Sequence, residues 1–401
     1  MTIIIAILSF KLLLFQGVCT FILLSRLARG ARRIPPLTPK LPYLALIGKV
    51  SVIIPTLNEC DRISPLLESI TRQSYETREI IFVDSNSTDG TQEKIENYSK
   101  KDPRIHLITD PPLPKNWVGR PWALHNGFLN SSENSEWILG VDADTIPHKN
   151  LVATVLDFAI QLDYDLVSFS PQFILKSMGE WWLQPSLLMT LLFRFESSGV
   201  NTNNPSTIMA NGQCFLIKRN ILTEINGYNY AANSFCDDVT LARYVASLGY
   251  KVGFADGSKI IKVRMYEGLQ DTWQGWGRSL DLKDASSKLQ LWGECLFLLL
   301  IQALPLPLFF LCLFFYPHFD FLSFKLLFAL NTFLVIIRFA LLGAIASSYQ
   351  FNKSISELTF ILSPFADILA VTRIILSALT KPSQWRGRVY DKNTCNLKPE
   401  T

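Results

Sequence analysis

Two apolar ends enclose a more polar middle, and this distribution limits the folds open to the chain. The stretch from Thr2 to Leu24 is almost wholly apolar and long enough for one bilayer crossing. Beyond Lys288, three further stretches reach a similar length, at residues 296–316, 321–346 and 358–379. With 49% hydrophobic and 18% charged residues, the 401-residue chain is too apolar for a soluble protein and too charged for a pure membrane bundle. We therefore predict a water-exposed domain held between membrane segments.

Basic residues beside the first apolar segment predict its orientation. That segment is followed by Arg26, Arg29, Arg32 and Arg33, and the positive-inside rule places the next part of the chain in the cytoplasm. A proline-rich linker at residues 34–42 then leads into the polar middle. The net charge of +4 is small and lies partly beside apolar segments, which favours membrane orientation over nucleic-acid binding.

The C-terminal tail conflicts with three crossings after the polar middle. Its basic residues, among them Lys381, Arg386 and Lys392, are typical of the cytoplasmic side, whereas three crossings would place the tail outside. One apolar segment is therefore expected to be re-entrant or interfacial, with the proline-broken residues 303–307 and the polar residues 363–367 as candidates. Two tryptophan-containing segments, 181–195 and 268–283, are either interfacial or ordinary core helices.

The cysteines exclude two kinds of structural site. All seven are scattered along the chain, and none has the C-x-x-C spacing of a zinc ligand pair. Their odd number and irregular positions also argue against a disulfide framework. This usage is compatible with a catalytic region in a reducing compartment.

The polar middle alternates between strand-like and helix-like stretches. Short apolar runs predict strands at residues 50–55, 79–84, 104–109 and 136–142. Between them, Asn58 is a candidate N-cap for a helix running towards Ser74, and a polar helix is expected to end near Lys100. The alternation predicts an α/β domain with a mostly parallel sheet and helices on both faces.

Two carboxylates, Asp142 and Asp144, follow the apolar run Trp137–Val141. Ligands of α/β sheets bind at the carboxyl ends of the strands, where these residues would lie. Magnesium is held in proteins by one or two carboxylates together with substrate phosphates. The pair therefore predicts a site for a metal and a diphosphate. The alternative is a simple strand-to-turn transition, because Asp favours turns and Pro147 follows.

Several short motifs follow one another in a fixed order, and the series is more specific than any one motif alone. Along the chain lie Pro55-Thr-Leu-Asn58-Glu59, Val83-Asp84, Ser85-Asn-Ser-Thr-Asp89-Gly90, Trp117-Val-Gly-Arg120-Pro-Trp122, Asp142-Ala-Asp144 and Phe235-Cys-Asp237-Asp238. From residue 49 to about residue 279, this series resembles the family 2 inverting glycosyltransferases with a GT-A fold. The resemblance implies a nucleotide-sugar-binding domain and transfer of a sugar.

The resemblance assigns expected roles on the donor side. Asp84 is expected to contact the nucleobase, Asp89 to lie in the loop that closes over the nucleoside, and Pro55, Asn58 and Glu59 to line the base pocket. Arg120 is expected at the diphosphate or the sugar, Asp142 at the donor and the metal, and Asp144 at a divalent metal, Mg or Mn. Two alternatives stay open: Asp89 as a cap of the next helix, and Arg120 as a solvated loop cation.

The acceptor side is expected to hold the general base that an inverting transfer requires. Asp238 matches the family's base, and Asp237 stands where a Glu is usual, which leaves the choice between the two open. Simple capping of a helix N-terminus is the alternative for both.

The acceptor-end motif is Trp273-Gln274-Gly-Trp276-Gly-Arg278, where Ser279 replaces the Trp of polymer synthases. This departure argues against a polysaccharide synthase. The segment Val263-Arg-Met-Tyr266, the Trp273–Trp276 motif and the tail Gln384–Tyr390 together resemble bacterial membrane-bound enzymes of isoprenoid lipids, with carotenoid glycosyltransferases as the most similar group.

Together these observations predict an integral membrane enzyme. Its expected parts are an N-terminal transmembrane helix at 1–25, a basic and proline-rich linker at 26–48, a GT-A catalytic domain at 49–265, an interfacial helix region at 266–290, C-terminal membrane helices at 291–380 and a basic tail at 381–401. The catalytic domain is expected to face the cytoplasm from a bacterial inner membrane. It would not bind nucleic acid.

The predicted reaction moves a sugar from a nucleotide-diphosphate donor to a lipid hydroxyl, with a hydroxylated carotenoid as the preferred acceptor. Alternative acceptors are a hopanoid, a glycerolipid, a ceramide-like lipid or a polyprenyl phosphate. An alternative of another class is a non-catalytic scaffold that binds a nucleotide sugar. The sequence does not identify the donor base, the sugar or the oligomeric state.

Overall fold

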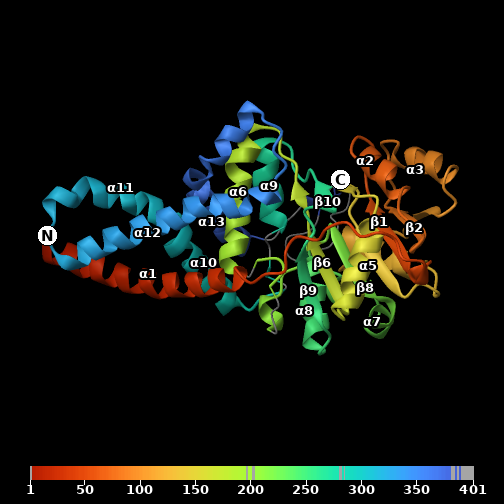
Figure 1. Cartoon of the computed structure of the whole chain (residues 1–401), viewed down its shortest axis with the longest axis horizontal. Coiled ribbons are helices and arrows are strands. Elements are labelled where there is room, and N and C mark those ends of the chain that lie inside the picture. The colour runs from red at the N-terminus through yellow and green to blue at the C-terminus, as the bar shows by residue number, and fades with distance from the viewer. Residues whose placement is uncertain are drawn as a thin grey trace. The chain divides into compact units, whose positions relative to one another are not determined.

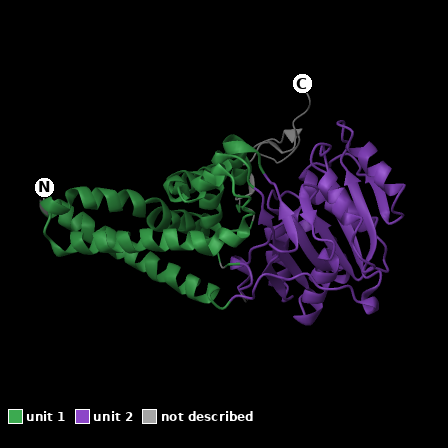
Figure 2. Ribbon diagram, turned by 45° about the horizontal axis from the view of Figure 1, so that its top comes forward, with its two compact units in different colours: residues 1–32, 175–197, 266–380 green, residues 33–174, 198–265, 381–401 purple. Residues whose placement is uncertain are grey.

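The chain divides into two compact units, shown in different colours in Figure 2. The structure is a computed structural model that describes residues 2–195, 197–200, 204–279, 282–283, 285–380, 384–385 and 388–389. The helical unit comprises Met1–Arg32, Leu175–Ser197 and Tyr266–Thr380, and the α/β unit comprises Arg33–Ile174, Ser198–Met265 and Lys381–Thr401. The chain therefore leaves the α/β unit between β7 and β8 to contribute one helix, α6, to the helical unit.

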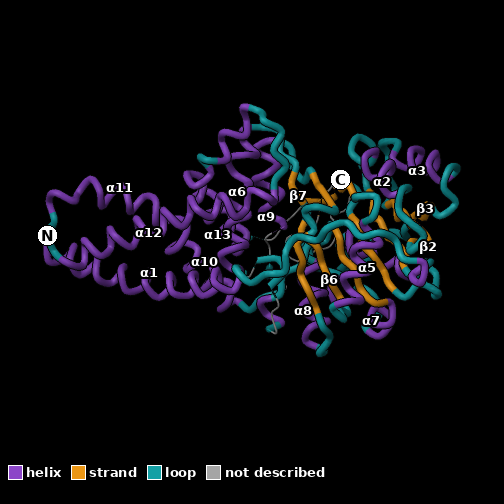
Figure 3. Tube along the Cα trace, viewed as in Figure 1, coloured by secondary structure: helices purple, strands orange, loops and turns teal. Residues whose placement is uncertain are grey.

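The α/β unit is built on a seven-stranded sheet with the strand order β3-β2-β1-β4-β8-β6-β9. Its strands are β1 (Val50–Thr56), β2 (Thr77–Asp84), β3 (Ile105–Thr109), β4 (Trp137–Val141), β6 (Leu166–Ser170), β8 (Cys214–Lys218) and β9 (Val252–Asp256). Neighbours pair in parallel except at β8, which is antiparallel to both β4 and β6. The predicted mostly parallel sheet is confirmed, as are the four predicted strands (Figure 3).

Helices cover both faces of this sheet because its central strands are apolar on both sides. In β1, Val52 and Ile54 belong to one large core with residues of α2 (Ser64–Ile70), α3 (Thr91–Ser99) and α5 (Leu151–Gln161). On the other face α4 (Gly119–Leu129) packs closely on the same strand, since a Cβ at Gly127 would lie 2.3 Å from a methyl carbon of Ile53. Burial on both faces is typical of parallel sheets. The remaining helices of this unit are α7 (Arg219–Glu224) and α8 (Asp237–Ser247).

A second, three-stranded sheet fixes the turn that follows β4. It consists of β5 (Thr145–Pro147), β10 (Ile261–Val263) and β7 (Gln172–Phe173), in that order. β5 begins directly after Asp144 and pairs antiparallel with β10. The backbone on both sides of the Asp142–Asp144 turn is thus held by strand pairing, which positions the two carboxylates.

The predicted helix start at Asn58 is wrong. The helix α2 begins at Ser64, with a proline in its first turn, and Asn58 lies in the preceding loop with a φ of 52°. Asn tolerates this left-handed conformation better than most residues, so the same residue type that favours an N-cap here forms a turn.

The helical unit combines long apolar helices with short buried ones. Its helices are α1 (Thr2–Gly30), α6 (Met178–Arg194), α9 (Gly268–Ser279), α10 (Lys288–Leu298), α11 (Pro305–Phe315), α12 (Leu322–Ile345) and α13 (Asp367–Leu379), with a π-helical turn at Leu299–Ala303. α12 packs against α1 and α11, and the three lie side by side in Figure 1. α6 is almost wholly buried inside this unit, which makes it a core helix in the described residues.

Two helices are long and apolar enough to cross a membrane within the described part of the chain, Ile3–Gly30 and Leu322–Ser348. A third span is possible if Lys288–Ala303 and Pro305–His318, which meet at a 46° bend, are counted together. The bend falls at the predicted break in residues 303–307.

The last apolar stretch is broken as well. It forms the 3₁₀ helices Ile355–Phe360 and Ser363–Ala366 before the 13-residue helix α13. At 1.5 Å per residue, α13 is about 20 Å long, which is less than the roughly 30 Å of a bilayer core. The segment therefore does not form a continuous spanning helix.

Other short elements of the described residues complete the chain. They are 3₁₀ helices at Leu44–Leu46, Pro205–Thr207, Asn229–Ala231, Tyr316–His318 and Ala346–Ser348, and the strands β11 (Gln384–Trp385) and β12 (Arg388–Val389). The rest of the predicted basic tail lies outside the described residues.

Candidate active site

The predicted donor-side residues converge at one edge of the α/β unit. β1, β2 and β4 are parallel neighbours, so the residues that follow them meet at the same edge. Asp84 ends β2, Asp142 follows β4, and Glu59 lies in the loop after β1. The first turns of α4 and α8 add Arg120 and the Asp237–Asp238 pair. The sheet topology thus brings together residues that are up to 179 positions apart in the sequence, from Glu59 to Asp238.

Asp84 organises the loop that follows β2. Its buried carboxylate accepts hydrogen bonds from the Thr56 hydroxyl at 3.1 Å, from the Ser87 amide and hydroxyl at 2.8 and 2.6 Å, and from Gln92 Nε2 at 2.6 Å. Four donors match the usual accepting capacity of a carboxylate. A nucleobase could bind Asp84 only by replacing one of these donors. The donors that it would replace are Ser87 or Gln92.

Asn58 and Asp89 join the loops after β1 and β2. The Asn58 side-chain oxygen accepts from the Thr88 amide at 3.0 Å, and Asp89 Oδ2 accepts from the Cys60 amide at 2.8 Å. Asp89 Oδ1 also accepts from the amide of Thr91, the first residue of α3, although the N-cap position of that helix is occupied by Gly90. Partial burial acts to raise the pKa of Asp89, but these hydrogen bonds lower it overall. Pro55, within β1, is half-buried at the base of the same loop.

Three carboxylates gather around the turn after β4. Burial, together with the nearby charges of Asp142 and Glu59, raises the pKa of Asp144 to about 8. Burial also raises the pKa of Glu59 to about 7, with Arg62 opposing and Asp142 and Asp89 adding to the rise. Glu59 and Arg62 form an ion pair at 3.4 Å. The mutual repulsion of these acids would be relieved by a cation.

Arg120 links the donor side to the acceptor side. Its Nε donates to Asp142 Oδ1 at 2.9 Å, its Nη2 donates to the Gly212 carbonyl at 2.6 Å, and its Nη1 donates to Asp237 Oδ2. Gly212 has no room for a side chain, since a Cβ there would lie 2.4 Å from Nη2. The guanidinium is therefore held between two acids that belong to different motifs, and it is not the solvated loop cation considered above.

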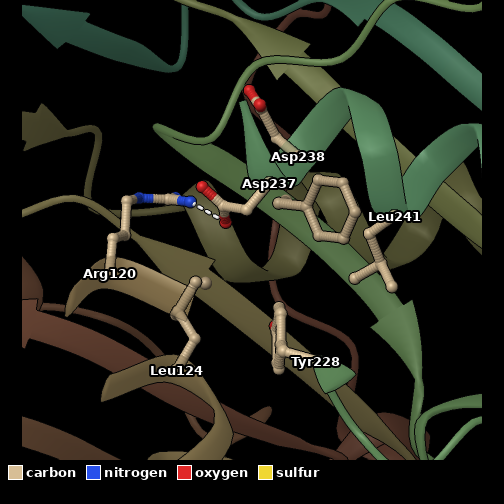
Figure 4. Close-up of a pocket in the computed structure, with 8 residues that line it drawn as sticks. Arg120, Leu124, Tyr228, Asp237, Asp238 and Leu241 are labelled. Carbon is tan, nitrogen blue, oxygen red and sulfur yellow. Dashed lines mark hydrogen bonds and ion pairs between the residues drawn. The ribbon is translucent and has the colours of Figure 1, made fainter. Parts of the chain in front are cut away.

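Asp237 and Asp238 differ in what they face. Asp237 is buried and ion-paired with Arg120, and in Figure 4 its carboxylate points towards that guanidinium. Asp238 is half-buried, its carboxylate points away from this pair, and its Oδ1 accepts from the Val239 amide at 2.9 Å. Burial raises the pKa of both, that of Asp237 to about 7, with Arg120 acting in the opposite direction. Asp238 is thus the acid that is left available to a substrate.

The carboxylates after β4 are suited to a metal ion whose ligands come partly from the protein and partly from a substrate. In the described residues no group of three or more His, Cys, Asp or Glu side chains is arranged to hold an ion by itself. Magnesium and similar hard cations commonly take only one or two protein carboxylates and complete their shell with phosphates and water. Asp142 and Asp144, crowded by like charge, are suitable donors of this kind.

The acceptor-end residues lie in the other unit. Trp273 is half-buried, Gln274 is exposed and Trp276 is buried on α9 of the helical unit, and the side chain of Arg278 lies outside the described residues. The guanidinium of Arg373 lies 5.5 Å from the ring centre of Trp273. Contact of this helix with an acceptor stays a prediction.

The sequence did not single out three residues of the α/β unit that matter to the site. Arg62 pairs with Glu59, Gly212 accepts from Arg120, and Tyr228 lines the pocket shown in Figure 4. Tyr228 and Gly212 belong to none of the sequence motifs, so no local signal marked them. Arg62 could have been found, because it lies three positions after Glu59.

Comparisons with known proteins agree with this geometry. The family model described as Glycosyl transferase family 2 matches residues 51–225. The chain is 27% identical over 235 residues to the probable glycosyltransferase YdaM of Bacillus subtilis, covering 58% of this chain and 53% of that protein. It is 25% identical over 247 residues to 4,4'-diaponeurosporenoate glycosyltransferase of Staphylococcus haemolyticus, covering 60% of this chain and 63% of that protein. The matches span less than two thirds of these relatives.

A solved structure shares the fold. The mannosyltransferase PcManGT from Pyrobaculum calidifontis, in complex with GDP-Man and Mn²⁺, aligns with a TM-score of 0.54 and 17% sequence identity, covering 93% of this chain and 97% of that chain. The mostly parallel sheet and the family match together establish the class of the α/β unit. Residues 51–225 thus match a family 2 glycosyltransferase domain, and the α/β unit has a GT-A fold.

Proposed function

We propose that this protein is a membrane-anchored, metal-dependent inverting glycosyltransferase that moves a sugar from a nucleotide-diphosphate donor to a lipid. The observation that carries the proposal is the arrangement of acids at one sheet edge. Asp142, from the turn that also holds Asp144, contacts Nε of Arg120, and Asp237, whose neighbour Asp238 is left available, contacts Nη1. This arrangement suits a diphosphate leaving group on one side and an attacking hydroxyl on the other.

On the donor side, the residues of this chain would bind and orient the nucleotide sugar. The loops tied together by Asn58, Asp84 and Asp89 would enclose the nucleoside. Asp144 and Asp142 would hold a divalent cation, which when bound neutralises the charge that develops on the leaving diphosphate. The PcManGT complex with GDP-Man and Mn²⁺ supports a donor and a metal of this kind.

On the acceptor side, Asp238 would act as the general base. The acceptor hydroxyl would give its proton to the Asp238 carboxylate while its oxygen attacks the anomeric carbon. The bond between that carbon and the diphosphate oxygen would break, and its electron pair would leave with the nucleoside diphosphate. One such base is what single-displacement inversion needs. Asp237 would position the site through its ion pair with Arg120.

The helical unit supports a lipid acceptor and a membrane location. Its helices Ile3–Gly30 and Leu322–Ser348 have the length and hydropathy of membrane spans. If the bent pair at residues 288–318 is a span and the 358–379 segment is not, two crossings follow the α/β unit. The basic tail would then return to the side of Arg26, Arg29 and Arg32, which the positive-inside rule assigns to the cytoplasm. This removes the parity conflict of the sequence.

A carotenoid acceptor is supported by the names of the relatives. 4,4'-Diaponeurosporenoate glycosyltransferases from Staphylococcus are 25–26% identical to this chain. Our preferred acceptor is a hydroxylated carotenoid, but the ending of the relatives' acceptor name denotes a carboxylate, which makes a carotenoid acid the second candidate. A carboxylate is ionised at neutral pH and needs no base, whereas an alcohol does.

The experiment is a transfer assay with the full chain in lipid nanodiscs. Donors such as UDP-glucose, UDP-GlcNAc and GDP-mannose would be offered with Mg²⁺ or Mn²⁺ and with carotenoid alcohols, carotenoid acids and other membrane lipids, followed by mass spectrometry of the lipids. We expect a metal-dependent glycolipid product. Transfer that is insensitive to EDTA, or turnover of no donor, would contradict the proposal.

One variant separates the two acceptor classes. Asp238→Asn should abolish transfer to an alcohol but reduce transfer to a carboxylate much less, because only the alcohol must lose a proton. Equal losses on both acceptors would show that Asp238 acts in some way other than as a base.

A further inference from the structure

A small pocket lies beneath the ion pair between Arg120 and Asp237. Figure 4 shows it from the side, with the two acids of α8 above and apolar side chains below. The lining residues include Arg120, Phe215, Tyr228, Asp237 and Asp238. The pocket is narrow and has space for about a single water molecule. Its walls are apolar apart from the two acids, Arg120 and the phenol of Tyr228.

The hydroxyl of Tyr228 is a buried polar group without a hydrogen-bond partner in the described residues. The side chain is 2% exposed, and the phenol oxygen accepts or donates no bond there. Burial raises the pKa of Tyr228 above its ordinary value, so the phenol keeps its proton and remains a donor. Buried hydroxyls in folded proteins are nearly always satisfied, by protein or by an ordered water.

The position of Tyr228 is fixed by its backbone. Gly227 adopts a φ of 70°, and a Cβ there would lie 2.4 Å from Nδ1 of His125. The amide of Tyr228 approaches the same His125 nitrogen at 3.4 Å. The backbone that carries the ring is thus held against His125, and the hydroxyl lies in the electrostatic range of Arg120 and Asp237.

We propose that one ordered water fills this pocket and links the Tyr228 hydroxyl to the carboxylate of Asp237, which makes Tyr228 a positioning residue of the active site. A buried water needs two to four polar partners, and the phenol, the Asp237 carboxylate and the guanidinium of Arg120 supply them. The donor hydrogen bond would keep Asp237 ionised and aligned with Arg120. Asp238 would then be left as the one acid of the pair that takes the substrate proton.

The consequence for catalysis rests on the proposed function, but the water site itself does not. The charged groups that line the pocket are Arg120 from α4 and Asp237 and Asp238 from α8, and the nearby charge of Asp142 also acts on the Asp237 carboxylate. Removing the phenol hydrogen bond would make protonation of the acid pair easier, since an anion loses one donor. The pair should then take up its proton at higher pH.

The test compares Tyr228→Phe, which keeps the ring, with Tyr164→Phe as a matched control. Tyr164 is also buried in the α/β unit, where its ring stacks on Phe158, and it belongs to no part of the site. Infrared titration of ¹³C-aspartate-labelled full-length protein would follow carboxyl protonation, with Asp237→Asn to assign the band. We expect Tyr228→Phe to shift this titration upward and Tyr164→Phe to leave it unchanged. An unshifted titration in Tyr228→Phe would overturn the proposal.

A second readout uses the transfer reaction. Tyr228→Phe should lower kcat by about three- to tenfold, the scale of one hydrogen bond, with KM for the donor unchanged and the acid side of the rate profile moved to higher pH. A wild-type kcat with a wild-type pH profile would refute the positioning role. If no donor is turned over at all, the proposed function fails while the infrared titration still decides the water site.

Discussion

Each unit of the molecule buries an arginine among carboxylates, but the charges balance in only one of them. In the helical unit, Arg338 pairs with Asp367 through two hydrogen bonds, Nε to Oδ2 at 2.7 Å and Nη2 to Oδ1 at 3.0 Å. Gln302 donates to the same carboxylate at 3.0 Å, and Ser186 Oγ accepts from Arg338 at 3.2 Å. One cation meets one anion, and neutral groups take up further bonds.

In the α/β unit, the acids around Arg120 outnumber the basic residues. Arg120 contacts Asp142 and Asp237, while Asp144, Asp238 and Glu59 lie close by, and Arg62 offsets only part of their charge. Buried charges are costly unless they are paired. The surplus of acid in one unit therefore indicates a site that a metal and a substrate complete. The balanced pair in the other unit indicates a structural contact that fixes α12 against α13.

The difference between the two clusters is tested most directly by removing Asp238, one of the excess acids around Arg120. Asp238→Asn should reduce transfer to an alcohol acceptor by about 10²- to 10⁴-fold, because the acceptor loses its general base. The thermal unfolding midpoint should change little, since this carboxylate is half-buried and forms no ion pair with another described residue. Asp157→Asn, a change on α5 where the carboxylate binds only Gln161 in the described structure, is the matched control and should keep full activity. Full transfer by Asp238→Asn would remove it from the mechanism.

Removing one partner of the Arg338–Asp367 pair should have the opposite effect, with a loss of stability and little loss of activity. Arg338→Met leaves the Asp367 carboxylate buried without its cation, which typically costs about 3–5 kcal/mol. The midpoint of thermal unfolding in detergent should fall, while kcat per folded molecule stays near that of the wild type. The double variant Arg338→Met with Asp367→Leu should regain part of the lost stability. A catalytic loss without a stability loss would reverse the assignment of the two clusters.

The pH dependence of transfer sharpens the assignment of the base. Burial raises the pKa of Asp238 above the ordinary 3.8 of an aspartate, against the opposing charge of Arg120. The active form is the carboxylate, so the rate should be maximal above this raised pKa and should fall as the pH drops through it. A rate that stays constant down to pH 4 would mean that the base is a less buried acid. Rate profiles of wild type and Asp237→Asn on an alcohol acceptor measure this.

The smallest expected effect lies in the apolar helices. Gln16 on α1 and Asn331 on α12 exchange two amide hydrogen bonds at 3.1 and 3.0 Å, and Gln16 also donates to the Leu300 carbonyl at 2.9 Å. Hydrogen bonds between membrane helices contribute about 0.6–2 kcal/mol. Gln16→Leu or Asn331→Leu should lower the unfolding midpoint slightly, and the double variant little further, because both remove the same contact. Additive losses in a double-mutant cycle would show that the two amides act independently.

The sequence predicted the elements whose signal is local. The strands β1 to β4 are short apolar runs, and Asp84 and Asp142 follow them directly, so the edge where they meet could be expected. The start of α2 could not, because Asn58 suits a left-handed turn as well as an N-cap. The break of the 358–379 stretch, in contrast, falls at Ser363–Ala366, within the polar residues 363–367 that the sequence marked as a candidate.

The contacts that define the site were not predictable for a different reason. The bridge from Arg120 to Asp237 spans 117 positions and depends on the close approach at Gly212. Tyr228 reaches the pocket only because Gly227 and His125 place its ring. In the sequence, Arg338 and Asp367 are isolated charged residues in apolar segments, and only the fold brings them together as an ion pair. Such contacts depend on tertiary packing, and the spacing of residues in the sequence does not predict them.

Binding of a nucleoside diphosphate is the most direct test that the surplus acid forms a metal–diphosphate site. Calorimetric titration of the full chain in nanodiscs with UDP and GDP, with and without Mn²⁺, would compare wild type, Asp144→Asn and Asp238→Asn. We expect binding of at least one nucleotide that requires the metal, is lost in Asp144→Asn and is retained in Asp238→Asn. Metal-independent binding, or equal binding by wild type and Asp144→Asn, would contradict the account.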